Sequence, residues 1–411
     1  MMRNVGRGGG TLLVRTGVVL AVVAVGWWSA TSHAPKSGGA NPLFPESRAA
    51  IGDGVKRGGD ARAGATSREG ASILGRDICS AAARRHGEEC SIYRVYHPSA
   101  WEREWRDHIR AWTGPVLSKH EETRRRIIRN SSIGCDHMRS HLREIDVWLD
   151  LVAARESIAR RSESVNGSCC WPEHLISYHS IHDKATGVVV ANVPIEPLAG
   201  FAHRHPKYHC FNNAAKYRVN KAYIINPFRA ELSPLMDCRG AVRSPRAFLF
   251  DLGASLYRSG FGGASQSWFV ESYAARGILF DRILSWEAAP HSPEEIFEGM
   301  PESVIDAVSY FNVPVNSTPG AIMNPLRVLR TLAQSEDFVV FKLDIDTVAL
   351  EEQFMEQIMG GDDQGGVPIV TLIDEFYFEP TSSRLGPKNV GHWHDMWFRL
   401  RKMGVRSHWW V

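Results

Sequence analysis

A short apolar stretch followed by small residues constrains the fold of this chain more than any other feature. Residues 247–255 read Ala-Phe-Leu-Phe-Asp-Leu-Gly-Ala-Ser. Four consecutive apolar residues before a turn are typical of a buried strand in a parallel sheet, because helices cover both faces of such a sheet. Open α/β sheets bind ligands outside the carboxyl ends of their strands. The stretch therefore predicts an α/β sheet with a ligand site at the turn that begins at Asp251.

A helix and a second strand follow this turn. Residues 266–276 carry apolar and aromatic residues at helical spacing, and residues 278–287 have the apolar pattern of a strand that ends in Glu287. In such a β-α-β unit, an acid at the end of the second strand can accept hydrogen bonds from both hydroxyls of a ribose. The spacing therefore predicts a nucleoside site at Glu287, and the alternative is a solvated acid at a strand end. The glycines lack the G-x-G-x-x-G spacing of a pyrophosphate site.

Strands and helices alternate in the rest of the sequence. Further strands are predicted at 307–313, 337–344, 367–378 and 405–411, and helices at 325–334, 348–359 and 393–403. Together with the first two strands they predict a doubly wound α/β sheet of about six strands.

Length and charge set outer limits on the function. The 411 residues, of which 44% are hydrophobic and 23% charged, suffice for about two domains besides flexible tails. The net charge of +3 comes from Lys and Arg that are spread along the chain. This charge pattern predicts no nucleic-acid partner.

An apolar run near the N-terminus follows a cluster of arginines. Arg3, Arg7 and Arg15 precede the apolar residues 17–28, and the positive-inside rule keeps the arginine side in the cytosol. A membrane contact through this run is therefore expected. The predicted segments are a cytosolic tail over 1–15, a signal anchor over 16–32 and a flexible stem over 33–72, which has too few large apolar residues for a core.

This arrangement predicts a single-pass type II membrane protein of the Golgi or endoplasmic reticulum, with its catalytic region in the lumen. The apolar run is short for a membrane span, which needs about 20 residues. Residues 32–34, Ser-His-Ala, also resemble a cleavage site. Secretion after signal cleavage is therefore the alternative.

Residues 73–240 are predicted to form a helical and irregular lumenal region before the sheet. Its helical part contains two apolar faces, which are more often core than binding surface. The faces comprise Trp101, Trp105, Ile109 and Trp112 in one helix and Ile145, Trp148, Leu149 and Val152 in another. Short strands are predicted at 187–192 and 222–225.

All seven cysteines precede the predicted sheet, at positions 79, 90, 135, 169, 170, 210 and 238. In an oxidising lumen they allow up to three disulfides. They have no C-x-x-C spacing, so the sequence predicts no metal site. Sequons at Asn130 and Asn166 add N-glycosylation as an expectation, and a third at Asn316 is a poor acceptor because Pro319 follows it.

Three short motifs of residues 245–411 together resemble class I S-adenosylmethionine-dependent methyltransferases, and most closely the FkbM-type group. The motifs are Phe-Asp-Leu-Gly-Ala at 250–254, Trp286-Glu287 at the second strand end, and Phe-Lys-Leu-Asp-Ile-Asp at 341–346. The resemblance implies a Rossmann-like methyltransferase domain over 245–411 with S-adenosylmethionine as its cofactor. It departs from the family at Ser255, where a second glycine is usual, and at Asp346-Thr347, where an acid-glycine pair is usual.

The resemblance also implies roles for individual residues. Asp251, Gly253 and the adjoining Ala254 and Ser255 would lie against the methionine part of the cofactor. Glu287 would bind its ribose. Lys342 and Asp344 would line the reaction cleft, with Lys342 on the cofactor side.

Methyl transfer to a hydroxyl also needs a group that takes the hydroxyl proton. The candidates are Asp344, Asp346 and His392, with His394 beside them. The alternative for the two histidines is packing at a helix start, and the alternative for Asp346 is capping of the 348–359 helix. Because glycans are abundant hydroxyl-bearing polymers in the lumen, the sequence predicts a sugar hydroxyl as the acceptor.

Two other functions stay open. Asp344-Ile-Asp346 imitates the D-x-D motif with which a type II Golgi glycosyltransferase holds a metal and a nucleotide sugar. The late position of this motif and the Asp-x-Gly turn, which would then have no role, disfavour that function. A methyltransferase-fold module without catalysis is the other alternative.

Overall fold

The computed structural model describes the chain in segments, all of which belong to the second of two compact units, residues 67–411. The described residues are 92–113, 132–161, 171–200, 205–208, 210–211, 214–239, 245–260, 263–334, 337–360, 368–379 and 390–410. The predicted tail, anchor and stem lie outside them, as do Asn130 and Asn166. Within these segments, no helix has both the length and the apolar character that a membrane span requires.

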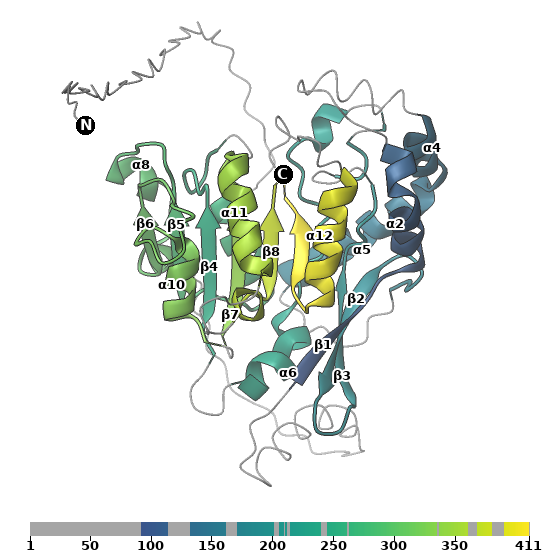
Figure 1. Cartoon of the computed structure of the whole chain (residues 1–411), viewed down its shortest axis with the longest axis horizontal. Helices are drawn as coiled ribbons and strands as arrows, with labels where there is room; N and C mark the ends of the chain where they lie inside the picture. Colours follow the sequence, from purple (N-terminus) through teal and green to yellow (C-terminus); the bar gives the residue numbers. More distant parts are fainter. Residues whose placement is uncertain are drawn as a thin grey trace, which may run out of the picture. The chain divides into compact units, whose positions relative to one another are not determined.

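A six-stranded parallel sheet forms the C-terminal half of the described chain (Figure 1). In sheet order, its strands are β6 (Val308–Phe311), β5 (Arg282–Trp286), β4 (Ala247–Leu252), β7 (Phe338–Leu343), β8 (Glu375–Phe378) and β9 (Arg406–Trp409). The prediction of an α/β sheet is therefore confirmed. Counted along the chain, the order is 3-2-1-4-5-6, in which the direction of winding reverses between the first and fourth strands. These two strands are β4 and β7.

Helices cover both faces of this sheet. The helices α10 (Pro325–Leu332), α11 (Val348–Met359) and α12 (Val390–Lys402) lie in front of it in Figure 1. On the other face, α7 (Ser265–Ala274) follows β4, and its Gln266 and Tyr273 side chains reach Ser285 of β5 and Tyr377 of β8. Two short helices, α8 (Pro293–Phe297) and α9 (Glu302–Ile305), connect β5 to β6.

The two faces of the sheet differ in chemistry. Toward α11 and α12, Phe250, Phe341 and Phe376 stack on one another across adjacent strands, with ring centroids about 6 Å apart. Toward α7, polar side chains stand in register on five neighbouring strands: Ser285, Asp251, Lys342, Tyr377 and His408. This row is fully buried, so each member needs a polar partner inside the protein.

The N-terminal half packs helices against a small antiparallel sheet. Its elements are β1 (Ile92–His97), α2 (Ala100–Thr113), α4 (Ser132–Ser140), α5 (Leu142–Arg160), β2 (Ser177–Asp183), β3 (Val189–Ile195), the 3₁₀ helix η1 (Ala214–Tyr217) and α6 (Arg229–Arg239). The predicted apolar faces are buried at Trp101, Trp105, Ile109, Ile145, Trp148 and Val152. A disulfide joins Cys135 of α4 to Cys210, which confirms a disulfide in this half.

Three predicted elements need correction. The strand β1 interrupts the region predicted to be helical, because it pairs with β2, more than 80 residues away. Residues 222–225 form no strand; Ile225 instead donates its backbone N–H to Glu196. The strand predicted over 367–378 is shorter, because residues 369–372 form the 3₁₀ helix η2 (Ile369–Leu372) after Pro368.

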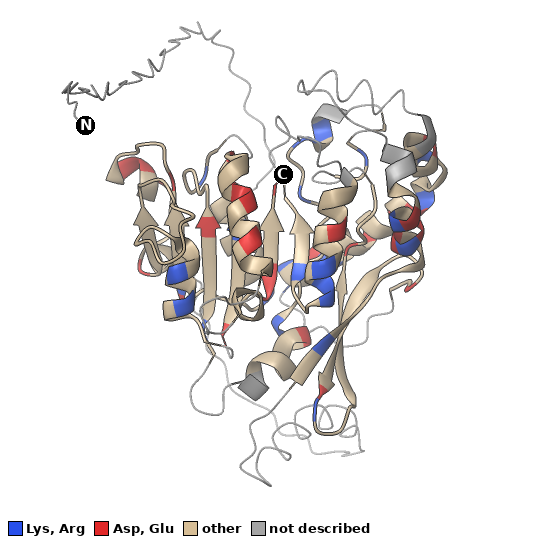
Figure 2. Cartoon of the chain, in the orientation of Figure 1, with Lys and Arg blue, Asp and Glu red and all other residues tan. Residues whose placement is uncertain are grey.

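Buried charges connect the two halves. Arg401 of α12 reaches the carboxylates of Glu102 and Glu196 at 3.4 and 3.5 Å, and donates to the backbone oxygen of Glu196 at 2.8 Å. His408 of β9 lies between Glu196 and Glu375, at 2.7 and 2.8 Å. Figure 2 shows the basic residues that gather at the C-terminal end of α12 and on β9. The edge of the six-stranded sheet is therefore covered by the N-terminal half.

Candidate functional site

The turn after β4 is held by groups from β5, from the residue that follows it, and from β6. The backbone oxygen of Trp286 accepts hydrogen bonds from the N–H groups of Gly253 and Ala254, at 2.9 and 3.1 Å. Glu287 accepts one from the N–H of Ser255 at 3.0 Å, and the Tyr310 hydroxyl donates to the Ser255 oxygen at 2.7 Å. The turn is therefore fixed before any ligand arrives.

Glycine is required at the centre of this turn. Gly253 has a φ of +77°, and a Cβ there would lie 1.6 Å from the backbone oxygen of Asp344. Ser255 also has a positive φ of 51°. Ser255 therefore adopts a left-handed backbone, which a glycine would adopt without a steric cost.

The buried side chain of Lys342 contacts three groups around the turn. Its ammonium lies 3.0 Å from Asp251 and 3.4 Å from Asp344, and it donates to the Gly253 oxygen at 2.7 Å. Burial alone would lower the pKa of Lys342, but Asp251 and Asp344 outweigh it and raise the pKa, so the amine stays charged. Because Lys342 and Asp251 are completely buried, both shape the turn from beneath it.

Asp251 keeps one unused acceptor. Its Oδ1 atom forms the ion pair with Lys342, and its Oδ2 atom has no hydrogen-bond partner within the segments that the structure describes. A buried carboxylate oxygen without a donor is costly unless a ligand or water supplies one. The Asp251 carboxylate can therefore accept a hydrogen bond from a further donor or contact a positively charged group.

A small apolar cavity opens beside Glu287. Its volume is about 110 Å³, and it lies at the carboxyl ends of β4, β5 and β7 and beside the loop after β6. The residues that line it are Gly253, Trp286, Glu287, Ala288, Val313, Pro314, Val315, Ile345, Thr347 and Leu350. An apolar cavity of about 150 Å³ holds a benzene ring, whereas whole drug-sized ligands need about 300 Å³ or more. The cavity is therefore smaller than one that holds a benzene ring, and it can take in only the edge of a flat ring, while the rest of the ligand lies over the turn.

Asp344 and Asp346 lie on the other side of Gly253. Burial is the main cause that raises the pKa of Asp344, and the negative charge of Asp346 adds to it, while Lys342 opposes both. Asp346 is exposed and has a φ of 54°. Neither acid is the N-cap of α11, because that position is Thr347, whose side chain makes no cap hydrogen bond. A carboxylate with a raised pKa beside the cavity can accept a proton.

Lys221, from the N-terminal half, was not predicted as a site residue. Its amine lies 4.6 Å from the centre of the Trp410 ring. Burial, aided by the charge of Lys342, lowers the pKa of Lys221 to about 8, although Asp344 and Glu379 oppose this. Its sequence context, Val-Asn-Lys-Ala, carries no signal of such a role, because only the fold brings residue 221 close to these strand ends.

The lowered pKa of Lys221 predicts a specific pH dependence of stability. Between about pH 8 and the ordinary pKa of 10.5, the unfolded chain holds the Lys221 proton and the folded chain does not. The free energy of unfolding should therefore rise with pH in this window, by up to roughly 1.4 kcal/mol per pH unit, relative to Lys221→Met. Urea unfolding of both proteins at several pH values measures this difference, and parallel curves would contradict it.

The two histidines lie in the first part of α12. His392 is exposed and packs edge-on against Trp393. His394 is buried; burial and the cations Arg401 and Arg106 lower its pKa to about 3. His394 therefore cannot hold a proton at neutral pH, and the packing alternative describes it better than a role as a base.

A larger cavity lies elsewhere. Its volume is about 670 Å³, and it lies between α10 and the C-terminal part of α11, with Arg327 and Gln357 among its lining residues. It shares no lining residue with the cavity beside Glu287. Volume alone would favour this cavity, but Asp344, Lys342 and Lys221, whose pKa values are altered, gather at the turn, and such groups mark functional sites more often.

Comparisons with known proteins add no assignment. No family model, no curated protein and no solved structure matches this chain. What the site can do therefore has to be argued from its own geometry: a hydrogen-bonded turn, a small apolar cavity, the half-buried Glu287 beside it, and two proton-accepting candidates, Asp344 and Lys221.

Proposed function

We propose that this chain is an S-adenosylmethionine-dependent O-methyltransferase-like protein of the secretory pathway that acts on a sugar hydroxyl of a glycan. The observation that carries the proposal is the position of the small apolar cavity directly beside Glu287, at the ends of β4 and β5. The edge of an adenine ring would enter the cavity, and the adjacent ribose would then face Glu287. The methionine part would extend over the turn toward Asp251 and Asp344.

The residues present fit this cofactor chemically. The cofactor supplies an electrophilic methyl group on a positively charged sulfur. Asp251 has a carboxylate oxygen without a hydrogen-bond donor in the described segments, and Asp344 lies on the far side of Gly253. The negative charges of these two carboxylates favour a cationic ligand over a phosphate. No cluster of backbone N–H groups is available for a pyrophosphate, because those of Gly253, Ala254 and Ser255 already have acceptors.

The chain's own part in the reaction is to position the acceptor and remove a proton. When bound, the cofactor would supply the methyl group, and Asp344 would take the proton that the acceptor hydroxyl gives up. The raised pKa of Asp344 suits this role. Lys221 is the second candidate for the proton, since its pKa of about 8 leaves part of it unprotonated near neutral pH.

Location in the secretory pathway rests on two features. The arginine cluster and apolar run of residues 3–28 predict a signal anchor, and the disulfide between Cys135 and Cys210 fits an oxidising lumen. Asn316 of the third sequon lies in the loop between β6 and α10, where its side chain accepts a hydrogen bond from the Thr318 N–H.

A glycosyltransferase that uses Asp344 and Asp346 is the second candidate, but one contact disfavours it. The Lys342 ammonium lies 3.4 Å from the Asp344 carboxylate. A divalent cation bound by Asp344 would therefore meet a buried positive charge at close range.

Glu287→Gln should weaken binding of S-adenosylhomocysteine by about 10-fold to 100-fold, because hydrogen bonds to a charged acceptor contribute about 1.5 to 3 kcal/mol each. The amide oxygen can still accept from the Ser255 N–H, whereas the Ala289 N–H, which donates to the other carboxylate oxygen at 2.8 Å, loses that acceptor, so circular dichroism checks that the variant is folded. Isothermal titration calorimetry of the full chain in detergent measures the affinity. Glu298→Gln, an exposed acid outside the cavity, is the matched control.

Each negative result of this titration would refute a different part of the proposal. Absence of binding by the unaltered chain would refute the cofactor, and equal affinity in Glu287→Gln would remove Glu287 from the site. In cells, mass spectrometry should find methyl-ether sugars with the unaltered chain and fewer with Asp344→Asn. Binding of the cofactor without any change in glycan methylation would refute the acceptor class alone.

A further inference from the structure

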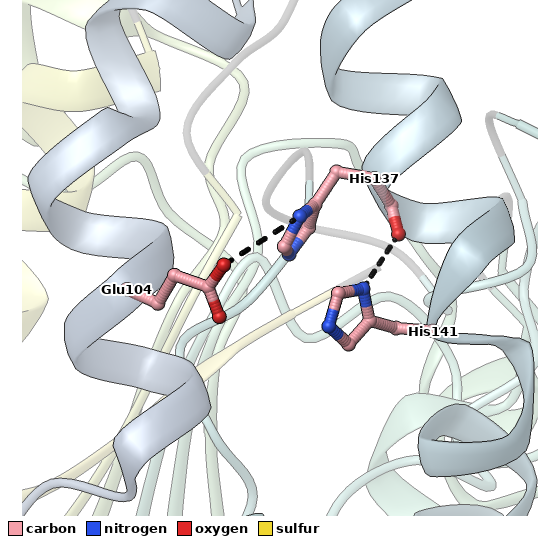
Figure 3. Close-up of side chains that lie close together, drawn as sticks. All are labelled: Glu104, His137 and His141. Carbon is pink, nitrogen blue, oxygen red and sulfur yellow. Dashed lines mark hydrogen bonds and ion pairs between the residues drawn. The ribbon is translucent and has the colours of Figure 1, made fainter.

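Two histidines and a glutamate meet in the N-terminal half, away from the turn (Figure 3). Glu104 belongs to α2, His137 to α4, and His141 is the residue between α4 and α5. One potential ligand atom of each lies within 4.8 Å of the other two, and no other such group of three occurs in the described segments. Because three helices contribute, the cluster is produced by tertiary packing.

The hydrogen bond that His141 makes through Nδ1 leaves its other ring nitrogen available to bind a metal ion. Its Nδ1 lies 2.9 Å from the backbone oxygen of His137, to which it can donate a hydrogen bond. A ring N–H that points at a carbonyl fixes the tautomer and leaves Nε2 with a free electron pair, as in metal-binding histidines. In Figure 3 the rest of the His141 ring points toward Glu104.

His137 and Glu104 complete the cluster. Nδ1 of His137 lies 4.0 Å from a carboxylate oxygen of Glu104, too far for a hydrogen bond. The His137 side chain is 10% exposed and that of Glu104 is 47% exposed, so the acid can move while the imidazole is fixed. The His137 and His141 rings lie 4.1 Å apart, and Trp101 stacks on His141.

The geometry points to a zinc site formed by Glu104, His137 and His141, which we propose as a second ligand-binding site of this protein. Zinc prefers imidazole nitrogens and carboxylate oxygens at about 2.0 to 2.2 Å, so two ligand atoms of one ion lie at most about 4 Å apart. The present spacing of up to 4.8 Å closes to this value if the exposed Glu104 side chain turns inward. Three protein ligands leave a fourth position for water.

The ion would join α2 to the junction of α4 and α5. The same junction is joined by the Cys135–Cys210 disulfide to the segment at residue 210, and Cys135 lies two residues before His137. Zinc and disulfide would thus stabilise one helical corner from two sides. This site is independent of the proposed methyltransferase function, and its test does not use that activity.

Loading the site requires one local change. The Trp101 indole N–H now donates to Nε2 of His137 at 3.2 Å. If zinc binds Nε2, it displaces this donor; if it binds Nδ1, Nε2 becomes a donor itself and repels the indole N–H. Either route separates Trp101 from His137, so Trp101 fluorescence should report the binding.

The test is calorimetric titration of zinc into the full chain, purified in detergent without a histidine tag and stripped with a chelator. We expect one equivalent to bind. Glu104→Gln and His141→Gln should each weaken the affinity at least about 100-fold, since even partners outside the coordination shell contribute about 10-fold to 100-fold. Asp107→Asn, an exposed acid on α2, should leave it unchanged and serves as the matched control.

Two further measurements keep the test decisive. Circular dichroism checks that each variant is folded, and a zinc-dependent change in tryptophan fluorescence should diminish in Trp101→Phe while zinc still binds. No saturable binding by the unaltered chain would overturn the proposal. Equal affinity in folded Glu104→Gln and His141→Gln would also overturn it, because the zinc would then lie elsewhere.

Discussion

Gly253→Ala should lower the free energy of unfolding by about 2 to 5 kcal/mol. The left-handed backbone costs a residue with a Cβ roughly 1 to 2 kcal/mol, and overpacking adds about 1 to 3 kcal/mol. The overlap is severe, because the new Cβ would lie 1.6 Å from the oxygen and 2.7 Å from the carbon of the Asp344 carbonyl. Both atoms belong to the backbone that follows β7, so they cannot rotate away as a side chain would.

Gly187→Ala is the control for this prediction. Gly187 has a similar φ of +69°, but no atom lies within 4 Å of the Cβ position. The control therefore bears only the conformational cost of about 1 to 2 kcal/mol. Urea unfolding monitored by circular dichroism compares the two variants. Equal losses of stability would show that β4 and β7 are not as close at this turn as the structure has them.

Arg406→Met should lower the free energy of unfolding by about 3 to 5 kcal/mol, the usual cost of leaving one partner of a buried ion pair alone. Arg406 is 1% exposed and donates to Glu375 at 2.6 Å. It also donates to the backbone oxygens of Pro194 and Ile225 at 3.0 and 2.8 Å. A methionine of similar length fills the space but leaves these acceptors without their donor.

Arg282→Met provides the comparison on the same sheet. Arg282 begins β5, is exposed, and donates only to the Ser309 hydroxyl at 3.1 Å among its described hydrogen bonds. Its removal should change stability by no more than about 0.5 kcal/mol. Thermal and urea unfolding measure both variants. A small loss in Arg406→Met would mean that His408 alone satisfies Glu375.

The sequence predicted the parts of the fold that are local in the chain. Each strand of the parallel sheet is a short apolar run with a turn at its end. The turn after β4 needs a glycine at position 253, and the sequence has one there. Glu287 was predicted to lie near this turn because the β-α-β unit has a regular length. The structure places its carboxylate 3.0 Å from the Ser255 backbone nitrogen.

The rest depends on contacts that no local pattern encodes. Residues 92–97 were expected to be helical, and only their pairing with residues 178–183 makes them a strand. Lys221 reaches the site through the packing of the N-terminal half. Trp101 was predicted as core, and it is buried, but its contact with His137 depends on how α2 packs against α4.

The buried charges that connect the two halves also have a consequence for synthesis. Glu102 and Glu196 leave the ribosome long before Arg401, which lies 299 and 205 residues later in the chain. At about 5 to 20 residues per second, this delay lasts roughly 10 to 60 s. Throughout that time the N-terminal half contains two acids that its folded form buries, without the arginine that stabilises them. The N-terminal half can therefore complete its packing only after the C-terminal sheet has been synthesised, although the N-terminal half is translated first.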